Sequence, residues 1–160
     1  MSLLERIEHV RDARAWEGEI PITNRYTAGP AGERFFHEIK DNGRLVGTRC
    51  PTCDLLYVPP RLYCEQCFAH LDEWVDVRNC GRVHTFTVVH VGLDGQPLDE
   101  PRILAFVRIE DTDGGLVHYL DEVEPEDVCI GMCVEPVFRP KTERKGSILD
   151  IAYFRPCQCE

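Results

Sequence analysis

The pattern of apolar and polar residues changes along the chain, from helical spacing near the N-terminus to β-branched and aromatic runs from Leu45 onwards. Residues 3–16 predict an amphipathic helix. Its apolar positions are Leu3, Leu4, Ile7, Val10 and Ala13. A second helix is expected from Pro30 to about Asn42, because proline suits a first helical turn and Gly43 suits the stop. Its apolar face would include Phe35, Phe36 and Ile39.

The second half of the chain is rich in strand-forming residues. The predicted strands are 82–91, 102–109, 115–120, 133–138 and 147–154. The longest polar breaks between them, 92–101 and 139–146, predict hairpin loops. Strands of this number and length indicate a mainly β fold with a small Greek-key barrel.

Four of the nine cysteines follow the spacing of a metal ribbon. Cys50 and Cys53 enclose two residues, Cys64 and Cys67 enclose two more, and ten residues separate the pairs. Each Cys-x-x-Cys can form a knuckle that presents two sulfurs to one ion, and four thiolates complete a closed tetrahedral shell. The spacing therefore predicts one structural metal ion, with zinc favoured and iron as the rival. A catalytic zinc is disfavoured, because four cysteines leave no open coordination position.

The remaining cysteines have weaker patterns. Cys80, Cys129 and Cys133 are interpreted as small buried hydrophobic residues. Cys157 and Cys159 lie near the C-terminus, where two sulfurs cannot close a tetrahedral shell. We interpret this last pair as incidental or prone to oxidation rather than as a second metal site.

The net charge of −10, from 28 acidic and 18 basic side chains, argues against nucleic acid as a partner. The loop 139–146 is basic in this acidic chain, which indicates either a solvated turn or a seat for a phosphate or an acidic surface. Charged residues interrupt the apolar N-terminal stretch, and no run of about 20 apolar residues indicates a membrane span. We therefore expect a cytoplasmic protein whose thiols stay reduced.

No convincing catalytic set is visible in the sequence. His84 and His90 would share one face of a strand and His118 lies on another, so packed barrel histidines are the simpler interpretation. The acidic segment 121–127 contains Pro125 and is typical of a solvated turn. Nucleophile elbows, phosphate loops and dinucleotide fingerprints are not found.

Several separated motifs resemble those of one known family. In chain order they are FF (35–36), GTRCPTC (47–53), PPR (59–61), CEQC (64–67), Trp74, GRVHTFT (81–87), IGM (130–132) and YFRP (153–156). This order is similar to that of the zinc-ribbon and OB-fold proteins once catalogued as a domain of unknown function and described as acyl-CoA-associated. The resemblance covers roughly residues 30–156. It implies N-terminal helices, a rubredoxin-like zinc ribbon and a C-terminal five-stranded OB-fold barrel.

The expected organisation combines these patterns with the resemblance. We expect an N-terminal helical segment at 1–44, a zinc ribbon at 45–76, an OB-fold at 77–156 and a tail at 157–160. The resemblance also matches Pro59, Pro60, Arg61 and Trp74 to recurrent motif positions.

One departure from the family concerns the residue after each second knuckle cysteine. Rubredoxin-type knuckles favour glycine there, whereas this chain has Asp54 and Phe68. Because phenylalanine adopts a left-handed conformation less readily than aspartate, we expect the second knuckle to be wider.

Family members accompany thiolases or related acyl-CoA condensing enzymes as small partner subunits, with benzoylsuccinyl-CoA-type thiolases among the candidate hosts. The resemblance implies a non-catalytic accessory subunit that helps to assemble the complex and to enclose or position the CoA thioester. Two alternatives remain open: a nucleic-acid-binding OB module, which the charge disfavours, and an independent acyl-CoA-handling enzyme, which lacks a visible catalytic set.

The apolar N-terminal residues have two interpretations. They are Leu3, Leu4, Ile7, Val10, Trp16, Phe35 and Phe36. Together with the ribbon they would form much of the surface that docks on the thiolase-like partner. Alternatively, they fold back onto the barrel as core.

Overall fold

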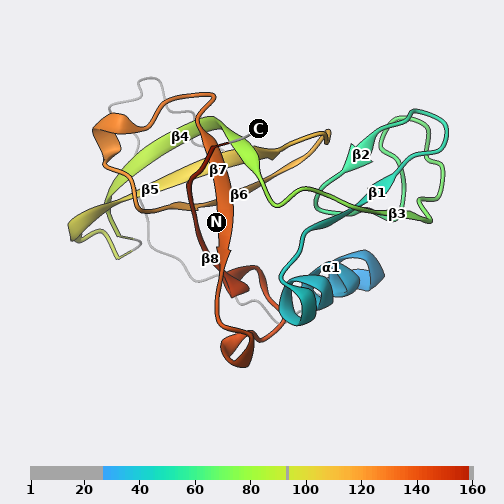
Figure 1. Ribbon diagram of the computed structural model, residues 1–160, viewed down its shortest axis with the longest axis horizontal. Helices are drawn as coiled ribbons and strands as arrows, with labels where there is room; N and C mark the ends of the chain where they lie inside the picture. The colour runs from blue at the N-terminus through green and yellow to red at the C-terminus, as the bar shows by residue number, and fades with distance from the viewer. Residues whose placement is uncertain (1–26, 93, 159–160) are drawn as a thin grey trace, which may run out of the picture.

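The computed structural model describes residues 27–92 and 94–158 as one α-helix, a three-stranded sheet and a closed five-stranded barrel (Figure 1). The mainly β fold class is therefore confirmed. The helix predicted at 3–16 lies outside the described residues. In Figure 1 the helix, in blue, lies close to the small sheet, in teal and green, while the barrel occupies the other side of the molecule.

Helix α1 spans Gly29–Asn42, as the sequence predicted. It ends at Gly43, whose φ of 63° is left-handed and whose backbone N–H donates to the Ile39 carbonyl at 3.1 Å. Phe35 and Ile39 are buried in the main hydrophobic core. The core interpretation thus holds for Phe35, and the expectation that it belongs to a docking surface is wrong.

The small sheet contains β1 (Val46–Arg49), β2 (Leu56–Tyr57) and β3 (Glu73–Asp76), in the order β2-β1-β3. Both pairings are antiparallel. The loops that leave β1 and β2 carry the cysteine pairs, so this sheet is the base of the expected ribbon.

The barrel strands run in the order β4-β5-β6-β8-β7. They are β4 (Gly81–Val91), β5 (Pro97–Ile109), β6 (Gly115–Leu120), β7 (Cys133–Phe138) and β8 (Ile151–Pro156). A parallel contact between Leu120 and Phe154 joins β6 to β8, and β7 pairs with both β8 and β4 to close the ring. This connectivity is the expected OB-fold, in which three antiparallel strands continue into a closed barrel.

Two strand boundaries differ from the sequence prediction. Strand β5 begins at Pro97, so the expected loop 92–101 is shorter, because Val91 already pairs with Pro97. Strand β8 begins at Ile151 rather than at residue 147, because a short 3₁₀ turn, Ile148–Asp150, precedes it. Ser147 and Asp150 form a capping box at that turn, and such local side-chain bonds compete with strand pairing.

One hydrophobic core joins the helix to the barrel. Its fully buried members include Phe35, Ile39, Leu45, Val83, Val107, Val134 and Phe154. Because α1 contributes to this core, the helix is held at a fixed place beside the barrel.

Candidate metal centre and its surroundings

The four ribbon cysteines converge, as their spacing predicted. The sulfur atoms of Cys50, Cys53, Cys64 and Cys67 all lie within 4.8 Å of one another. Cys50 and Cys64 are fully buried, whereas the other two are partly exposed. Within the described residues this is the one group of three or more potential metal ligands at such distances. Four thiols in this arrangement suit a tetrahedral ion such as zinc.

The two knuckles have matching backbones. In the first, Asp54 donates its N–H to the Cys50 carbonyl at 2.9 Å; in the second, Phe68 donates to the Cys64 carbonyl at 3.0 Å. Asp54 and Phe68 both adopt left-handed backbones, with φ of 56° and 58°. The expectation of a wider second knuckle is therefore wrong. The Phe68 side chain is 79% exposed, so its ring meets no packing obstacle, and the cost of the left-handed backbone is about 1–2 kcal/mol.

Hydrogen-bond donors surround the Cys64 sulfur. The Tyr57 hydroxyl lies 3.3 Å from it, and the Gln66 backbone N–H donates to it at 3.4 Å. Together with the backbone N–H of Cys67, these donors lower the pKa of the Cys64 thiol to about 6. Burial, and then the bond to Cys64, raise the pKa of the Tyr57 hydroxyl to about 12. The surroundings thus favour the thiolate at Cys64, which is the form that binds metal.

The neighbouring thiol at Cys53 has the opposite tendency. Its hydrogen bond with Cys67, followed by burial, raises its pKa to about 12. Closely spaced thiols cannot all ionise easily, because each negative charge opposes the next. A bound cation would remove this opposition.

Few apolar side chains support the ribbon. Besides the cysteines, its buried cluster contains only Tyr57 and Leu71, with Leu55 and Ala69 packed against them. A core of this size is too small to hold a fold by burial alone, so the sulfur cluster carries much of the local structure.

The barrel touches the ribbon through the β5–β6 hairpin. Asp113 donates its backbone N–H to the Leu56 carbonyl at 2.9 Å, and its carboxylate accepts the Leu56 N–H at 2.9 Å. Gly114 lies against the backbone of Val58, where an added Cβ would come within 2.0 Å of the Val58 oxygen. This contact positions the ribbon relative to the barrel.

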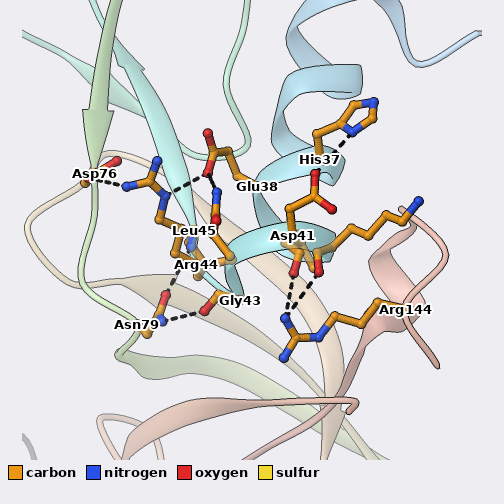
Figure 2. Close-up of polar contacts among 12 residues, drawn as sticks. His37, Glu38, Asp41, Gly43, Arg44, Leu45, Asp76, Asn79 and Arg144 are labelled. Atoms are coloured by element: carbon orange, nitrogen blue, oxygen red, sulfur yellow. Dashed lines mark hydrogen bonds and ion pairs between the residues drawn. The ribbon is translucent and has the colours of Figure 1, made fainter. Parts of the chain in front are cut away.

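A second set of polar contacts joins the helix to the ribbon (Figure 2). Arg44 pairs with Glu38 at 2.7 Å and with Asp76 of β3 at 2.6 Å. The bond from Arg44 lowers the pKa of the Glu38 carboxyl. Asn79 accepts the Leu45 N–H at 3.0 Å and donates to the Gly43 carbonyl at 3.1 Å. The segment after the helix is therefore fixed from both sides.

The basic loop has a structural use that the sequence did not reveal. Arg144 donates to the Ile39 and Lys40 carbonyls at 3.3 Å each, so it caps the C-terminus of α1 (Figure 2). Arg139 donates to the Leu149 carbonyl at 2.8 Å. These two cations bind backbone oxygens of the chain itself, so both already have a role within the fold.

The histidines do not form a catalytic set. The ring of His84 packs edge-on against Phe106, with centroids 5.7 Å apart. His118 is buried beside Phe154, and burial lowers its pKa. Its Nδ1 has no hydrogen-bond partner among the described residues. The structure brings none of these rings to the sulfur cluster.

The other cysteines divide by exposure. Cys80 and Cys133 are half-buried, and Cys129 is exposed, so the prediction of a buried residue is wrong for Cys129. It lies just before the turn at Gly131, which places it outside the barrel interior. Cys157 is half-buried, and Cys159 lies outside the described residues.

A groove of about 570 Å³ separates α1 from the ribbon. Phe36 lines it from the helix, and Pro59, Pro60, Arg61 and Tyr63 line it from the ribbon. Three of the recurrent motif positions therefore gather at one surface feature. We call it the helix–ribbon groove. Trp74 lies outside it, with the Arg34 guanidinium 4.2 Å from its ring centroid.

A four-cysteine ribbon joined to a closed five-stranded barrel defines the class of rubredoxin-like zinc ribbon and OB-fold proteins. A family model described as the ChsH2 rubredoxin-like zinc ribbon domain matches residues 37–73, and one described as the ChsH2 C-terminal OB-fold domain matches residues 74–139. The chain belongs to this family, which is also called DUF35.

Three relatives illustrate the similarity. A DUF35 domain-containing scaffold protein of Methanocaldococcus jannaschii is 31% identical over 128 residues, which cover 78% of this chain and 90% of the relative. A DUF35 protein of unknown function from Sulfolobus solfataricus has a solved structure with a TM-score of 0.59 and 31% identity, covering 68% of this chain and 78% of that one. The Ltp2–ChsH2(DUF35) aldolase gives a TM-score of 0.56 and 25% identity, covering 86% of this chain and 98% of that one.

Across the described residues, every helix is too short or too polar to cross a bilayer.

Proposed function

We propose that this protein is a non-catalytic accessory subunit of a thiolase or related acyl-CoA condensing enzyme. It would help to assemble the complex and to enclose or position the CoA thioester. The observation that carries this proposal is the similarity to the chain from the Ltp2–ChsH2(DUF35) aldolase, which extends over 98% of that chain. The name scaffold protein given to the Methanocaldococcus jannaschii relative supports the same role.

The proposed metal ligands are Cys50, Cys53, Cys64 and Cys67, with one zinc ion as the favoured occupant and iron as the alternative. Their four sulfurs leave no position for substrate, so the role of the ion is to hold the ribbon. This supports an accessory rather than a catalytic function.

The helix–ribbon groove is the proposed contact with the thiolase-type subunit. Its lining is mostly apolar and includes Tyr63, whose side chain is 58% exposed. Aromatic residues at the centre of an apolar groove commonly supply much of an interface's binding free energy. The proposed segments are 1–44, 45–76, 77–156 and the tail 157–160, and the groove lies between the first two.

The charge of the barrel gives less support to the nucleic-acid alternative. Oligonucleotides commonly bind an OB-fold across its second and third strands, which are β5 and β6 here. Asp99, Glu100, Asp121 and Glu124 line a groove beside these strands. Carboxylates at that place repel phosphates.

Co-expression and co-purification with a candidate thiolase-type subunit test the proposal. We expect the two chains to elute together and the present chain alone to show no thiolysis. Tyr63→Ser should weaken the complex about tenfold or more, because it removes an exposed aromatic contact. Val91→Ser is the matched control, since Val91 is 52% exposed and does not line the groove.

Two results would contradict this assignment. Thiolysis by the isolated chain would favour an independent acyl-CoA-handling enzyme. Separate elution of the two chains at concentrations well above the dissociation constants of typical stable complexes would contradict the proposed partnership.

A further inference from the structure

The outer surface of β5 and β6 carries an apolar patch. Along β5, Ile103, Ala105 and Val107 point into the barrel and are buried, so the alternate residues point outwards. The patch consists of Leu104 and Phe106 on β5 and Val117 and Tyr119 on β6.

These four side chains form two cross-strand pairs. Leu104 lies directly opposite Tyr119, and Phe106 lies directly opposite Val117. Directly opposed side chains on one face of a sheet are in contact range, so the patch is continuous. Val117 is 60% exposed and Tyr119 is 40% exposed. Contiguous apolar surface of this kind is typical of an interaction site rather than of a solvated sheet.

An acidic groove of about 960 Å³ borders the patch, and Tyr119 belongs to both. Four carboxylates line this groove: Asp99, Glu100, Asp121 and Glu124. Across residues 27–92 and 94–158, none of them takes part in an ion pair. Arg102 is the one cation among the described lining residues, and its guanidinium lies 5.7 Å from the Tyr119 ring centroid. The four carboxylates outnumber this one cation, so the groove is negative.

We propose that the apolar patch and the acidic groove together bind a segment of a partner protein in which apolar residues alternate with lysine or arginine. The apolar side chains would cover the patch, and the cations would reach the four carboxylates. A second copy of this chain fits poorly, because two acidic grooves on chains of charge −10 would repel each other.

This surface is separate from the helix–ribbon groove. The two sets of lining residues have no member in common. The inference therefore stands without the proposed thiolase partnership, and a test that uses a synthetic probe examines it alone.

The probe is a peptide of about eight residues in which leucine and lysine alternate, so that it is amphipathic as an extended strand. Two matched peptides replace lysine by glutamate or leucine by serine. Each is titrated into the full-length, ¹⁵N-labelled protein. We expect chemical-shift changes at Leu104, Phe106, Val117 and Tyr119 with the leucine–lysine peptide only, and weaker binding as salt is raised.

Variants locate the binding. Val117→Ser combined with Tyr119→Ser should weaken the peptide complex about tenfold or more, because it removes the exposed half of the patch. Glu100→Gln combined with Glu124→Gln should reduce the salt dependence, because fewer charges are screened. Ile130→Ser should leave the affinity unchanged, because Ile130 is 71% exposed and lies outside the patch and outside both grooves. These side chains are exposed, so the fold is retained.

Several results would overturn the proposal. One is equal binding of the leucine–glutamate peptide, and another is a set of shift changes that maps away from β5 and β6. Self-association of the chain through the same residues would assign the patch to a second copy. Binding that appears only after residues 1–26 are removed would assign it to the chain's own N-terminal segment.

Discussion

Asp150 shows how one side chain can fix the end of a loop. Its carboxylate is buried and accepts the backbone N–H groups of Lys145, Gly146 and Ser147 at 2.8, 2.7 and 3.3 Å. Burial alone would raise the pKa of this carboxyl, but the three hydrogen bonds outweigh burial and lower it. The charged form is therefore favoured in the folded state.

The lowered pKa of Asp150 predicts a loss of stability in acid. The folded-state pKa of Asp150 lies below the ordinary value of about 3.9. The ionised carboxylate therefore makes its full contribution to the free energy of unfolding above pH about 3.9, and this contribution is lost as the pH falls through the folded-state pKa. Asp150→Asn should lower the free energy of unfolding by about 3 kcal/mol near neutral pH, and the difference should shrink in acid. Urea unfolding across the pH range measures this. Asp99→Asn, an exposed control, should change stability by less than about 0.5 kcal/mol. If the free energies of unfolding of the unsubstituted protein and of Asp150→Asn differed by the same amount at every pH, the ionisation of Asp150 would not contribute to stability as predicted.

At the scale of elements, the β5–β6 hairpin is the part of the barrel that bonds to strand β2 of the ribbon. The absence of a side chain at Gly114 allows its backbone to approach that of Val58. Asp113 then makes two hydrogen bonds with the backbone of Leu56, one with the N–H and one with the carbonyl of Leu56. Two elements that are distant in sequence are thus joined through backbone groups and the Asp113 carboxylate.

Gly114→Ala tests this junction. The added Cβ would lie 2.0 Å from the Val58 oxygen, so the hairpin must move away from the ribbon. We expect a loss of about 1–3 kcal/mol in stability and faster hydrogen exchange of the Leu56 amide, whose acceptor is Asp113. Gly92→Ala is the control, because its new Cβ would come within 2.8 Å only of the end of the exposed Asp94 side chain, while the Gln96 carbonyl and the Leu98 side chain stay at an ordinary 3.6 Å. Unchanged exchange at Leu56 would show that the junction tolerates the displacement.

The elements that the sequence predicted well are those with local signals. Helix α1 is marked by Pro30 and Gly43, the cysteine cluster by its spacing, and the barrel strands by their composition. The junctions could not be predicted, because each joins residues far apart in the chain. Arg144, for example, caps a helix that ends about 100 positions earlier, and no local pattern distinguishes it from a solvated cation.

At the scale of the whole molecule, two hydrophobic clusters differ greatly in size. The main cluster joins α1 and the barrel through many fully buried side chains, whereas the ribbon cluster has few besides its cysteines. Burial can therefore stabilise the barrel without a metal, but it cannot hold the ribbon in the same way. The two parts should respond differently when the sulfur cluster is disturbed.

Metal removal tests this difference. We expect one zinc ion per chain by elemental analysis, because four thiolates fill one tetrahedral shell. Cys64→Ser should lose the ion and broaden the amide signals of the ribbon, while the signals of the barrel persist. Cys80→Ser is the control, because Cys80 is half-buried and does not belong to the cluster.

Acid should release the ion, because protons compete with it for the sulfurs. Cys53 has a pKa raised to about 12, so binding must displace its proton, and each fall in pH favours the protonated cluster. A colour-forming chelator should therefore detect zinc release as the pH is lowered from about 7 to about 5, with loss of ribbon signals over the same range. A chain that keeps ribbon and barrel signals after complete metal removal would show that its small apolar cluster suffices, and would contradict the structural role of the four cysteines.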